Sequence, residues 1–173
     1  TRLPGKALKI LGNKPVLAWV LEAMKKVPAD SYFVATDKDS YALLKPVCDK
    51  YSFNCFAGDL NDVLKRFCDL IKQNDVKTVI RATADNPFLF YEAAKESAVL
   101  FEERNQKGHC DYLTYSGLLH GSVVEVFSVC LLSSCSIHSD DLSFRSGVYC
   151  IVNPVSSDNS HSEDISLTVP FRT

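Results

Sequence analysis

Long apolar runs, a surplus of one charge and closely paired cysteines are all missing from this sequence of 173 residues. Without about 18 consecutive apolar residues, no segment has the length that a membrane-spanning helix needs. The 19 basic and 21 acidic residues leave a net charge of −2, which argues against the broad basic surface of a duplex-binding protein. We therefore expect neither a membrane nor a nucleic acid as partner, and an anionic ligand has to be held by a local cluster of donors.

The seven cysteines include no CxxC pair, the spacing that is typical of zinc and redox sites. Most of them lie within apolar runs, where a reduced cysteine behaves as a small hydrophobic residue. A chain of this size does not need disulfides to fold. We therefore expect buried free thiols and a reducing, cytoplasmic location.

With 46% hydrophobic and 23% charged residues, the composition is that of a folded domain rather than of a disordered chain. The length favours a single domain over residues 1–173. The sequence starts at Thr1 without an initiator methionine, and residues 166–173 have the pattern of a strand that nothing follows. We expect this domain to be incomplete at both ends.

Helical and extended patterns alternate along the chain. Apolar residues recur at helical spacing over 16–24, 59–73 and 90–104. Asp39 or Ser40 can cap a further helix, which Pro46 should shorten or kink. Short apolar runs predict strands at 31–36, 52–56, 77–82, 111–115, 123–128 and 147–152. This order predicts an α/β fold with a mainly parallel sheet covered by helices on both faces, and ligands that bind outside the carboxyl ends of the strands.

The segment Arg2-Leu3-Pro4-Gly5-Lys6 has the residue types of a phosphate-binding loop. Gly5 lets the backbone approach a ligand closely. Arg2 offers a planar fork of donors and Lys6 a compact charge, and both suit phosphate oxygens. The spacing is not that of a P-loop, and a frayed basic terminus is the alternative interpretation.

The segment Arg81-Ala82-Thr83-Ala84-Asp85-Asn86-Pro87 places a carboxylate directly after a buried strand. Pro87 ends the strand pairing, so we expect Asp85 to point into the cleft. One carboxylate, together with phosphate oxygens and water, is a common way to hold Mg²⁺. An Asx turn or a helix cap at Asp85 is the other possibility. Arg81 needs an anionic partner if it lies inside a strand.

Two other segments each allow two interpretations. Residues 58–66 read as a capped surface helix with Asp59 or Asn61 as the cap, or as part of a binding site. In the run 123–127, Glu125 lies on the face opposite to its valine neighbours and meets either substrate hydroxyls or solvent. No Ser-His-Asp arrangement is apparent, and the 4 histidines lack metal-ligand spacing.

Together these segments resemble the sugar-activating cytidylyltransferases, above all the family linked to spore-coat polysaccharide biosynthesis. Acylneuraminate and 3-deoxy-manno-octulosonate cytidylyltransferases are more distant relatives. The matching segments follow one another between residues 1 and 130: TRLPGKAL, the helix after GNKPVLAWV, VATD, AGDLNDVLKRF, VIRATADNP, DYLTYS and GSVVEVFS. The residues after 137 match poorly.

The resemblance implies a Rossmann-like nucleotidyltransferase fold and magnesium-dependent transfer of a cytidylyl group from CTP to a sugar or sugar-acid hydroxyl. The products are a CMP-sugar, used for surface polysaccharide biosynthesis, and pyrophosphate. The resemblance further implies that Arg2 and Lys6 act on the triphosphate, that Asp85 holds the metal and that Glu125 contacts the sugar. It implies a nucleotide-binding role for a larger set of positions: Arg2, Gly5, Lys6, Thr36, Asp37, Gly58, Asp62, Arg66 and Arg81.

The sequence departs from the family pattern at two places. The strand with an arginine and a serine that usually precedes the RLPGK loop is missing, and Val169 is followed by Pro170 rather than by an aspartate. A second metal-binding carboxylate is therefore not visible. A nucleotidyltransferase for another triphosphate or a non-sugar acceptor, or a non-catalytic nucleotide-binding relative, stays open as an alternative. Because relatives often form dimers, we consider a homodimer possible.

Overall fold

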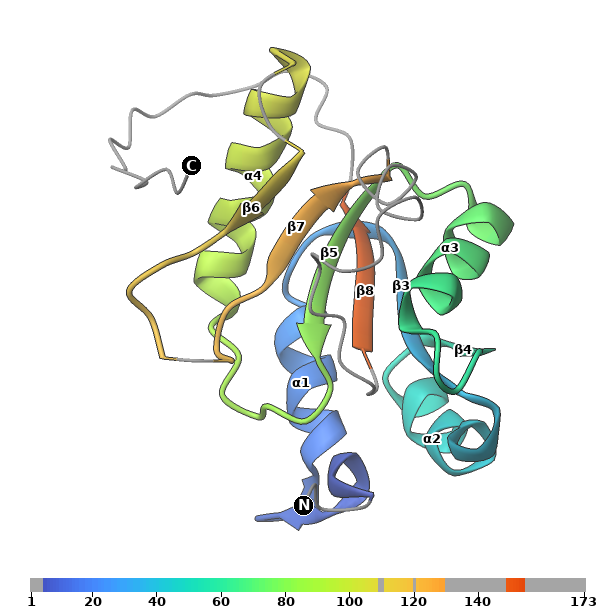
Figure 1. Cartoon of the computed structure of the whole chain (residues 1–173). Helices are drawn as coiled ribbons and strands as arrows, with labels where there is room; N and C mark the ends of the chain where they lie inside the picture. The colour runs from blue at the N-terminus through green and yellow to red at the C-terminus, as the bar shows by residue number, and fades with distance from the viewer. Residues whose placement is uncertain (1–4, 109–110, 120, 130–148, 155–173) are drawn as a thin grey trace.

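The computed structural model describes residues 5–108, 111–119, 121–129 and 149–154. Strands and helices alternate after an N-terminal turn and hairpin (Figure 1). The helices are η1 (Lys6–Leu8), α1 (Val16–Met24), α2 (Lys38–Lys50), α3 (Val63–Asn74) and α4 (Tyr91–Gln106). The strands are β1 (Ile10–Leu11), β2 (Lys14–Pro15), β3 (Ala29–Asp37), β4 (Asn54–Gly58), β5 (Thr78–Thr83), β6 (Tyr112–Thr114), β7 (Glu125–Ser128) and β8 (Tyr149–Pro154).

A six-stranded sheet in the order β4-β3-β8-β5-β7-β6 forms the centre of the molecule. β3 and β4 pair in parallel, whereas β8 pairs antiparallel with both β3 and β5. β7 is antiparallel to both β5 and β6. Hence β3, β4, β5 and β6 run in one direction, and β7 and β8 run in the other. The predicted α/β fold is confirmed. Four strands run in one direction, as a mainly parallel sheet requires, but β8 lies between β3 and β5 and β7 between β5 and β6, so four of the five strand pairs are antiparallel.

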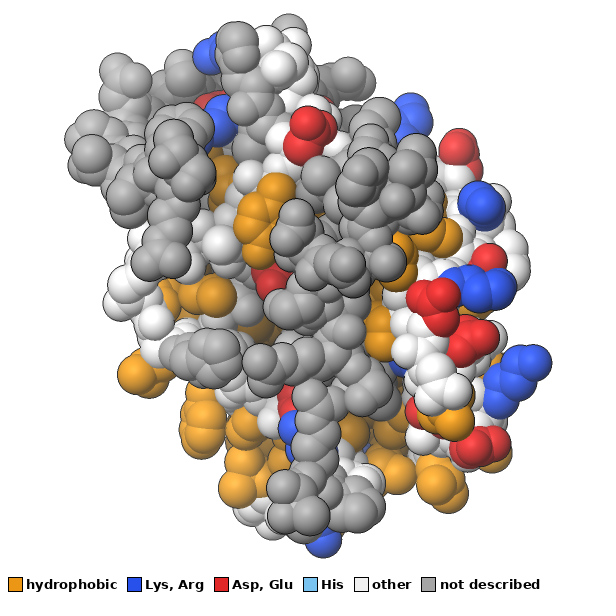
Figure 2. All heavy atoms as spheres, in the orientation of Figure 1, with side chains coloured by type: hydrophobic (Ala, Val, Ile, Leu, Met, Phe, Trp, Pro, Cys, Tyr) orange, Lys and Arg blue, Asp and Glu red, His pale blue; other side chains and the backbone are white. Residues whose placement is uncertain are grey.

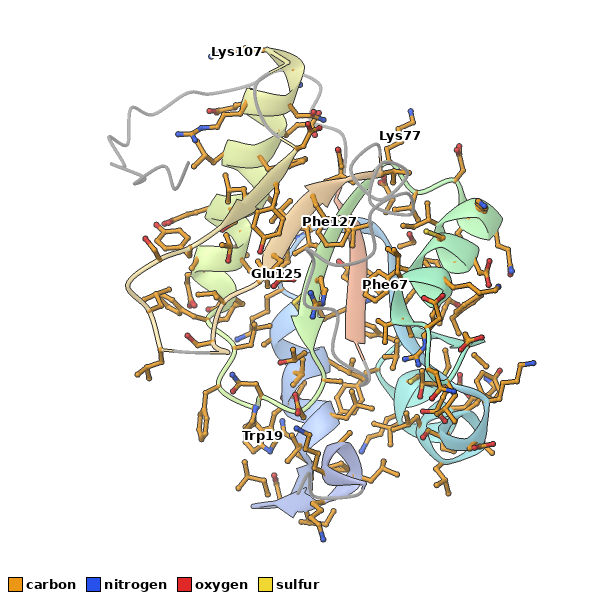
Figure 3. The ribbon with its side chains drawn as sticks, viewed as in Figure 1. Trp19, Phe67, Lys77, Lys107, Glu125 and Phe127 are labelled. Carbon is orange, nitrogen blue, oxygen red and sulfur yellow. The ribbon has the colours of Figure 1, made fainter. Side chains whose placement is uncertain are left out.

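Each face of the sheet has its own apolar core. On one face, α1, α2 and α4 bury residues such as Leu21, Leu44 and Phe101 against the sheet. On the other face, α3 packs Phe67 near Phe127 of β7, with ring centroids 6.4 Å apart (Figure 3). Helices therefore cover both faces, as the apolar strands predict.

Helices α2 and α3 differ from the sequence-based expectation in their caps and in the effect of Pro46. Asp37 caps α2, one residue before the helix, and Pro46 lies inside this helix without ending it. Leu44 and Cys48, on either side of Pro46, are both buried in the core, so tertiary packing outweighs the lost backbone donor. Asp62, rather than Asp59 or Asn61, caps α3.

The outer surfaces of α2 and α3 carry charges of both signs. Figure 2 shows acidic and basic side chains interspersed over this side of the molecule. Lys45 pairs with Asp49 at 2.8 Å and Lys65 with Asp69 at 2.5 Å, in each case one helical turn apart. Within the described ranges, no helix has both the length and the apolar character needed to cross a bilayer.

Candidate functional site

The turn at residues 5–8 presents Lys6 at the surface. Gly5 has a φ of 62°, a conformation that favours glycine, and its carbonyl accepts a hydrogen bond from the Leu8 N–H at 3.0 Å. Ala7 is buried in the core beside α1, and this burial anchors the turn. Arg2, the second predicted phosphate ligand, lies outside the described residues.

Lys6 forms an ion pair with Asp85, which lies in the turn after β5. Ala84 is fully buried and holds that turn against the core, while the side chains of Lys6 and Asp85 are 47% and 28% exposed. Figure 1 shows the arrowhead of β5 pointing toward the N-terminal turn and hairpin. The structure thus brings together two of the three side chains that the sequence predicts to converge on a polyanion.

The loop before β7 is held against this same turn. The Asn86 side-chain oxygen accepts a hydrogen bond from the Phe88 N–H at 3.1 Å. A Cβ atom on Gly121 would lie 2.5 Å from the Asn86 amide nitrogen, so glycine permits this close approach. The Phe90 N–H donates to the Ser122 carbonyl at 2.8 Å. The position of Asp85 therefore depends on two loops that are distant in sequence.

The carboxyl ends of β3 and β4 adjoin, because Asp37 lies opposite Gly58 in the strand register. The Asp37 carboxylate accepts a hydrogen bond from the Ser40 N–H at 2.7 Å. Burial of this carboxyl opposes ionisation, but the hydrogen bonds from Ser40 and the nearby charge of Arg66 lower the pKa of Asp37 overall. Thr36 is fully buried, and its hydroxyl has no hydrogen-bond partner within the part of the chain that the structure describes.

Arg66 is buried and holds the loop that follows β4. Its Nε and Nη2 donate to the Asp59 carbonyl at 2.9 and 2.6 Å. A Cβ atom on Gly58 would stand 2.5 Å from Cγ of Arg66, so glycine leaves room for this side chain. Asp62 accepts the Lys65 N–H at 2.8 Å as the cap of α3. Gly58, Asp62 and Arg66 therefore belong to one structural unit, and their contact with a nucleotide stays a prediction.

Arg81 and Glu125 face each other in the β5–β7 register and form an ion pair. Glu125 supplies the anionic partner that an arginine inside a strand requires. Figure 3 shows Glu125 at the start of β7, near the end of β5. The Arg81 side chain is 10% exposed and the Glu125 side chain 34%, so the carboxylate keeps a solvent-facing part.

Tyr112 of β6 joins this pair and is a residue that the sequence reasoning missed. Tyr112 is 41% exposed, and the partial burial of its phenol, followed by the negative charge of Glu125, raises the pKa of Tyr112 to about 12. The signal in the sequence was the period of two in the strand, which places Tyr112 and Thr114 on one face. Only the strand register shows that Thr114 lies opposite Glu125.

The described residues contain no group of three or more side chains that could together hold a metal ion. Mg²⁺ is usually bound through one or two carboxylates together with phosphate oxygens and water. Asp85 is a single, partly exposed carboxylate beside the turn that carries Lys6. This arrangement fits a magnesium ion that arrives with a triphosphate rather than one held by the protein alone.

Three groups of side chains lie at one edge of the sheet: the Lys6–Asp85 pair, the residues at the ends of β3 and β4, and the Arg81–Glu125 pair. β3, β4 and β5 run in the same direction, so their carboxyl ends lie at that edge: Asp37 ends β3, Gly58 ends β4 and Asp85 follows β5. Glu125 begins an antiparallel strand and therefore lies toward the same edge. Ligands of open α/β sheets bind at this position, outside the carboxyl ends of the strands.

Residues 1–141 match the protein-family model described as cytidylyltransferase. The spore coat polysaccharide biosynthesis protein SpsF of Bacillus subtilis (strain 168) is 35% identical over 95 residues, which are 51% of this chain and 40% of that protein. A 3-deoxy-manno-octulosonate cytidylyltransferase of Alteromonas mediterranea is 27% identical over 132 residues, which are 74% of this chain and 50% of that protein. The chain thus spans half or less of the length of these relatives.

A solved structure described as a cytidylyltransferase from Leptospira borgpetersenii serovar Hardjo-bovis (strain JB197) has a TM-score of 0.68 to this chain at 24% identity. The aligned region covers 80% of this chain and 59% of the Leptospira chain, and the similarity confirms the nucleotidyltransferase fold that the sequence predicts. The family model extends over most of the sequence and includes the positions of Lys6, Asp85 and Glu125. The chain therefore belongs to the cytidylyltransferase family.

Proposed function

We propose that this chain transfers a cytidylyl group from CTP to a hydroxyl of a sugar or sugar acid, releasing pyrophosphate and serving surface polysaccharide biosynthesis. The family supports the nucleotide, and the names of SpsF and of the 3-deoxy-manno-octulosonate enzyme support the acceptor class. The observation that carries the proposal is the meeting of Lys6 and Asp85 at the carboxyl edge of the sheet.

Charge neutralisation and positioning are the main requirements of this reaction. The acceptor oxygen forms a bond to the α-phosphorus, and the bond from that phosphorus to the β-phosphate oxygen breaks. Pyrophosphate leaves with the electron pair, and the hydroxyl proton passes to water. Lys6, with Arg2 in the same loop, binds the triphosphate, and Gly5 allows the backbone to come close to it. Because pyrophosphate gains charge as it leaves, these cations stabilise the transition state.

Asp85 is the proposed ligand of the metal that accompanies CTP. Magnesium, when bound, neutralises phosphate charge and polarises the phosphorus centre. Asp85 would hold the metal from the turn after β5, and the buried Ala84 keeps this turn in place. Its partly exposed side chain leaves room for phosphate and water ligands.

We assign the ends of β3 and β4 to the nucleoside, with Asp37 and Asp62 facing that side and the buried Thr36, Gly58 and Arg66 supporting it. The register of Asp37 with Gly58 and the hydrogen bonds of Arg66 support this, because they make the two strand ends one rigid surface. Glu125 is assigned to the sugar. Arg81, predicted to bind the nucleotide, is paired with Glu125 and therefore acts on the substrate through that carboxylate.

We further propose that residues 1–173 belong to a single nucleotidyltransferase domain and that the protein acts in the cytoplasm as a homodimer. The free thiol of Cys48, buried in the core, and the partly buried thiols of Cys55 and Cys68 suit a reducing compartment. Size-exclusion chromatography with light scattering measures the oligomeric state, and a monomeric mass would contradict the dimer.

Pyrophosphate release tests the proposed reaction. The chain is incubated with CTP, Mg²⁺ and a panel of sugar acids that includes 3-deoxy-manno-octulosonate and N-acetylneuraminate. We expect release with at least one acceptor, loss of turnover in Asp85→Asn and weaker CTP binding in Lys6→Ala. Lys9→Ala is the matched control, since Lys9 is exposed and adjoins the same turn. Absence of both turnover and CTP binding would falsify the proposal.

Thermal shift with CTP, UTP, GTP and ATP tests the nucleotide preference. A ligand that binds the folded state stabilises it in proportion to the logarithm of its concentration over its Kd. We expect CTP to raise Tm most. A larger shift with another triphosphate would replace CTP by that nucleotide, and nucleotide binding without turnover would indicate a non-catalytic relative.

A further inference from the structure

The ion pair between Lys6 and Asp85 uses the two side chains that the proposed function assigns to opposite ligand charges. In the proposed reaction the Lys6 ammonium has to bind a triphosphate, and the Asp85 carboxylate has to bind a divalent cation. In the chain without ligands, each group neutralises the other. The contact therefore occupies the polyanion site and the cation site at the same time.

We propose that the Lys6–Asp85 pair is an autoinhibitory contact that discriminates against CTP arriving without a divalent cation. This inference rests on the proposed function. A metal-free triphosphate has to separate Lys6 from Asp85 and then lies beside an uncompensated carboxylate of like charge. A triphosphate with a bound cation replaces both partners together, so no charge is left alone.

The backbone around the pair favours an exchange of partners by side-chain rotation. Ala7 and Ala84 are buried next to the paired residues and anchor both turns. The Lys6 side chain is 47% exposed and carries its ammonium on a flexible chain of methylenes, so the ammonium can move without a shift of the core. The Asp85 side chain is 28% exposed and is likewise open to solvent on one side. The contact is thus stable enough to form and accessible enough to be broken by a ligand.

The exchange makes the two ligands cooperative. Breaking the pair costs free energy only once. The first ligand to bind breaks the pair, so the second ligand binds without this cost. By thermodynamic linkage, the cation raises the affinity for CTP by the same factor by which CTP raises the affinity for the cation. For a partly exposed pair this factor is about two- to fivefold, beyond any direct attraction between the ligands.

Calorimetric titration of metal-free CTP, with a chelator present, tests the inference on the intact chain. The variants are Asp85→Asn, Lys6→Gln and the double variant Lys6→Gln/Asp85→Asn. We expect Asp85→Asn to bind metal-free CTP about two- to fivefold more tightly than the unaltered chain. In the Lys6→Gln background the same substitution should give a smaller gain, because there is no ammonium to release. The difference between the two gains isolates the pair from simple charge repulsion.

Glu22→Gln is the matched control. Glu22 pairs with Lys14 in the same N-terminal region, so this substitution also removes one negative charge and the anionic partner of one lysine. We expect it to change the affinity for metal-free CTP less than Asp85→Asn does. An equal effect would mean that overall charge, and not this pair, sets the affinity.

A gain of equal or larger size in the Lys6→Gln background would overturn the autoinhibitory contact while leaving the proposed function in place, because CTP still binds. Lack of CTP binding by every variant, with and without Mg²⁺, would instead overturn the proposed function. Circular dichroism of each variant establishes that the fold is intact.

Discussion

Arg81 and Glu125 stand directly opposite each other on β5 and β7, and their side chains form an ion pair. The two positions lie 44 residues apart in the sequence. This pair connects a residue predicted for the nucleotide with one predicted for the sugar. The orientation of the Glu125 carboxylate is therefore set by the neighbouring strand, with Tyr112 on the strand beyond.

Replacing Glu125 by glutamine should destabilise the fold. The Arg81 side chain is 10% exposed and would lose the countercharge that Glu125 provides. The expected loss in the free energy of unfolding is about 2 kcal/mol, below the cost for a fully buried pair because Glu125 is partly exposed. Urea denaturation measures this loss. The double variant Arg81→Met/Glu125→Leu should recover most of it, and a double variant as unstable as Glu125→Gln would show that the pair is not the cause.

Tyr112 should make the fold lose stability in alkaline solution. Its pKa rises from an ordinary value of 10.0 to about 12 in the folded chain. Between these values the unfolded chain releases the phenolic proton and the folded chain retains it, so unfolding becomes more favourable as the pH rises. The contribution is fully present below pH 10 and is lost as the pH rises through about 12.

Tyr112→Phe should flatten this alkaline decline in the free energy of unfolding, measured by urea denaturation at a series of pH values. Glu125→Gln should lower the pKa of Tyr112 but leave it above its ordinary value, because burial is the larger cause. Difference absorbance of the tyrosinate, taken against Tyr112→Phe, reports that pKa. An unchanged pKa in Glu125→Gln would contradict the proximity of the two groups.

Asp37 should stabilise α2 through its cap. Asp37→Ala removes the acceptor of the Ser40 N–H, with an expected loss of about 1 kcal/mol. Asp37→Asn keeps an oxygen that accepts this hydrogen bond, so it should lose less. Because the pKa of Asp37 is lowered, its charge-dependent contribution is present above the ordinary value of 3.8 and is lost as the pH falls below it.

The same two variants separate a structural role of Asp37 from a role in binding. If Asp37 contacts the nucleotide through its charge, Asp37→Asn should weaken CTP binding several-fold with little loss of stability. Calorimetry and thermal unfolding on one preparation distinguish these effects. Equal CTP affinity in Asp37→Asn would remove Asp37 from the nucleotide site and leave it as a helix cap.

Gly58→Ala should disturb the loop after β4. The added Cβ would stand 2.5 Å from Cγ and 3.2 Å from Cα of Arg66, so either the side chain or the backbone of α3 must shift. We expect a loss of about 1–3 kcal/mol in the free energy of unfolding. If the loop borders the nucleotide, CTP binding should weaken as well. Unaltered stability in denaturant titrations would show that Arg66 repacks at no cost.

The alternation of strands and helices was predictable because it depends on local periodicity. Helix α3 illustrates the limit of that reasoning. Its apolar face was evident in the sequence, but its start was not, since Asp59, Asn61 and Asp62 are all suitable caps. In the structure Asp59 accepts the Asn61 and Asp62 N–H groups at 2.9 Å and closes the preceding turn, which leaves Asp62 as the cap. Competition among neighbouring acceptors is decided by the three-dimensional path of the loop.

The shortening of α2 that Pro46 predicted does not occur, for a related reason. A proline inside a helix removes one donor and crowds the preceding turn, and this was the basis for expecting a shorter or kinked helix. Whether the helix continues depends on what its other side chains gain by packing. Leu44 and Cys48 are buried in the core of the sheet, and this contribution is not visible in the local sequence.

By itself, the sequence determined the order of the elements, the glycine turn with its lysine, the carboxylate after a buried strand and the family to which they belong, because these properties reside in short segments. Only the tertiary structure decided which charges meet. Lys6 lies against Asp85, Arg81 against Glu125, and Tyr112 beside that second pair. Strand register and loop packing select these partners across long separations in the chain, and ionic interactions depend on distances that no local pattern encodes.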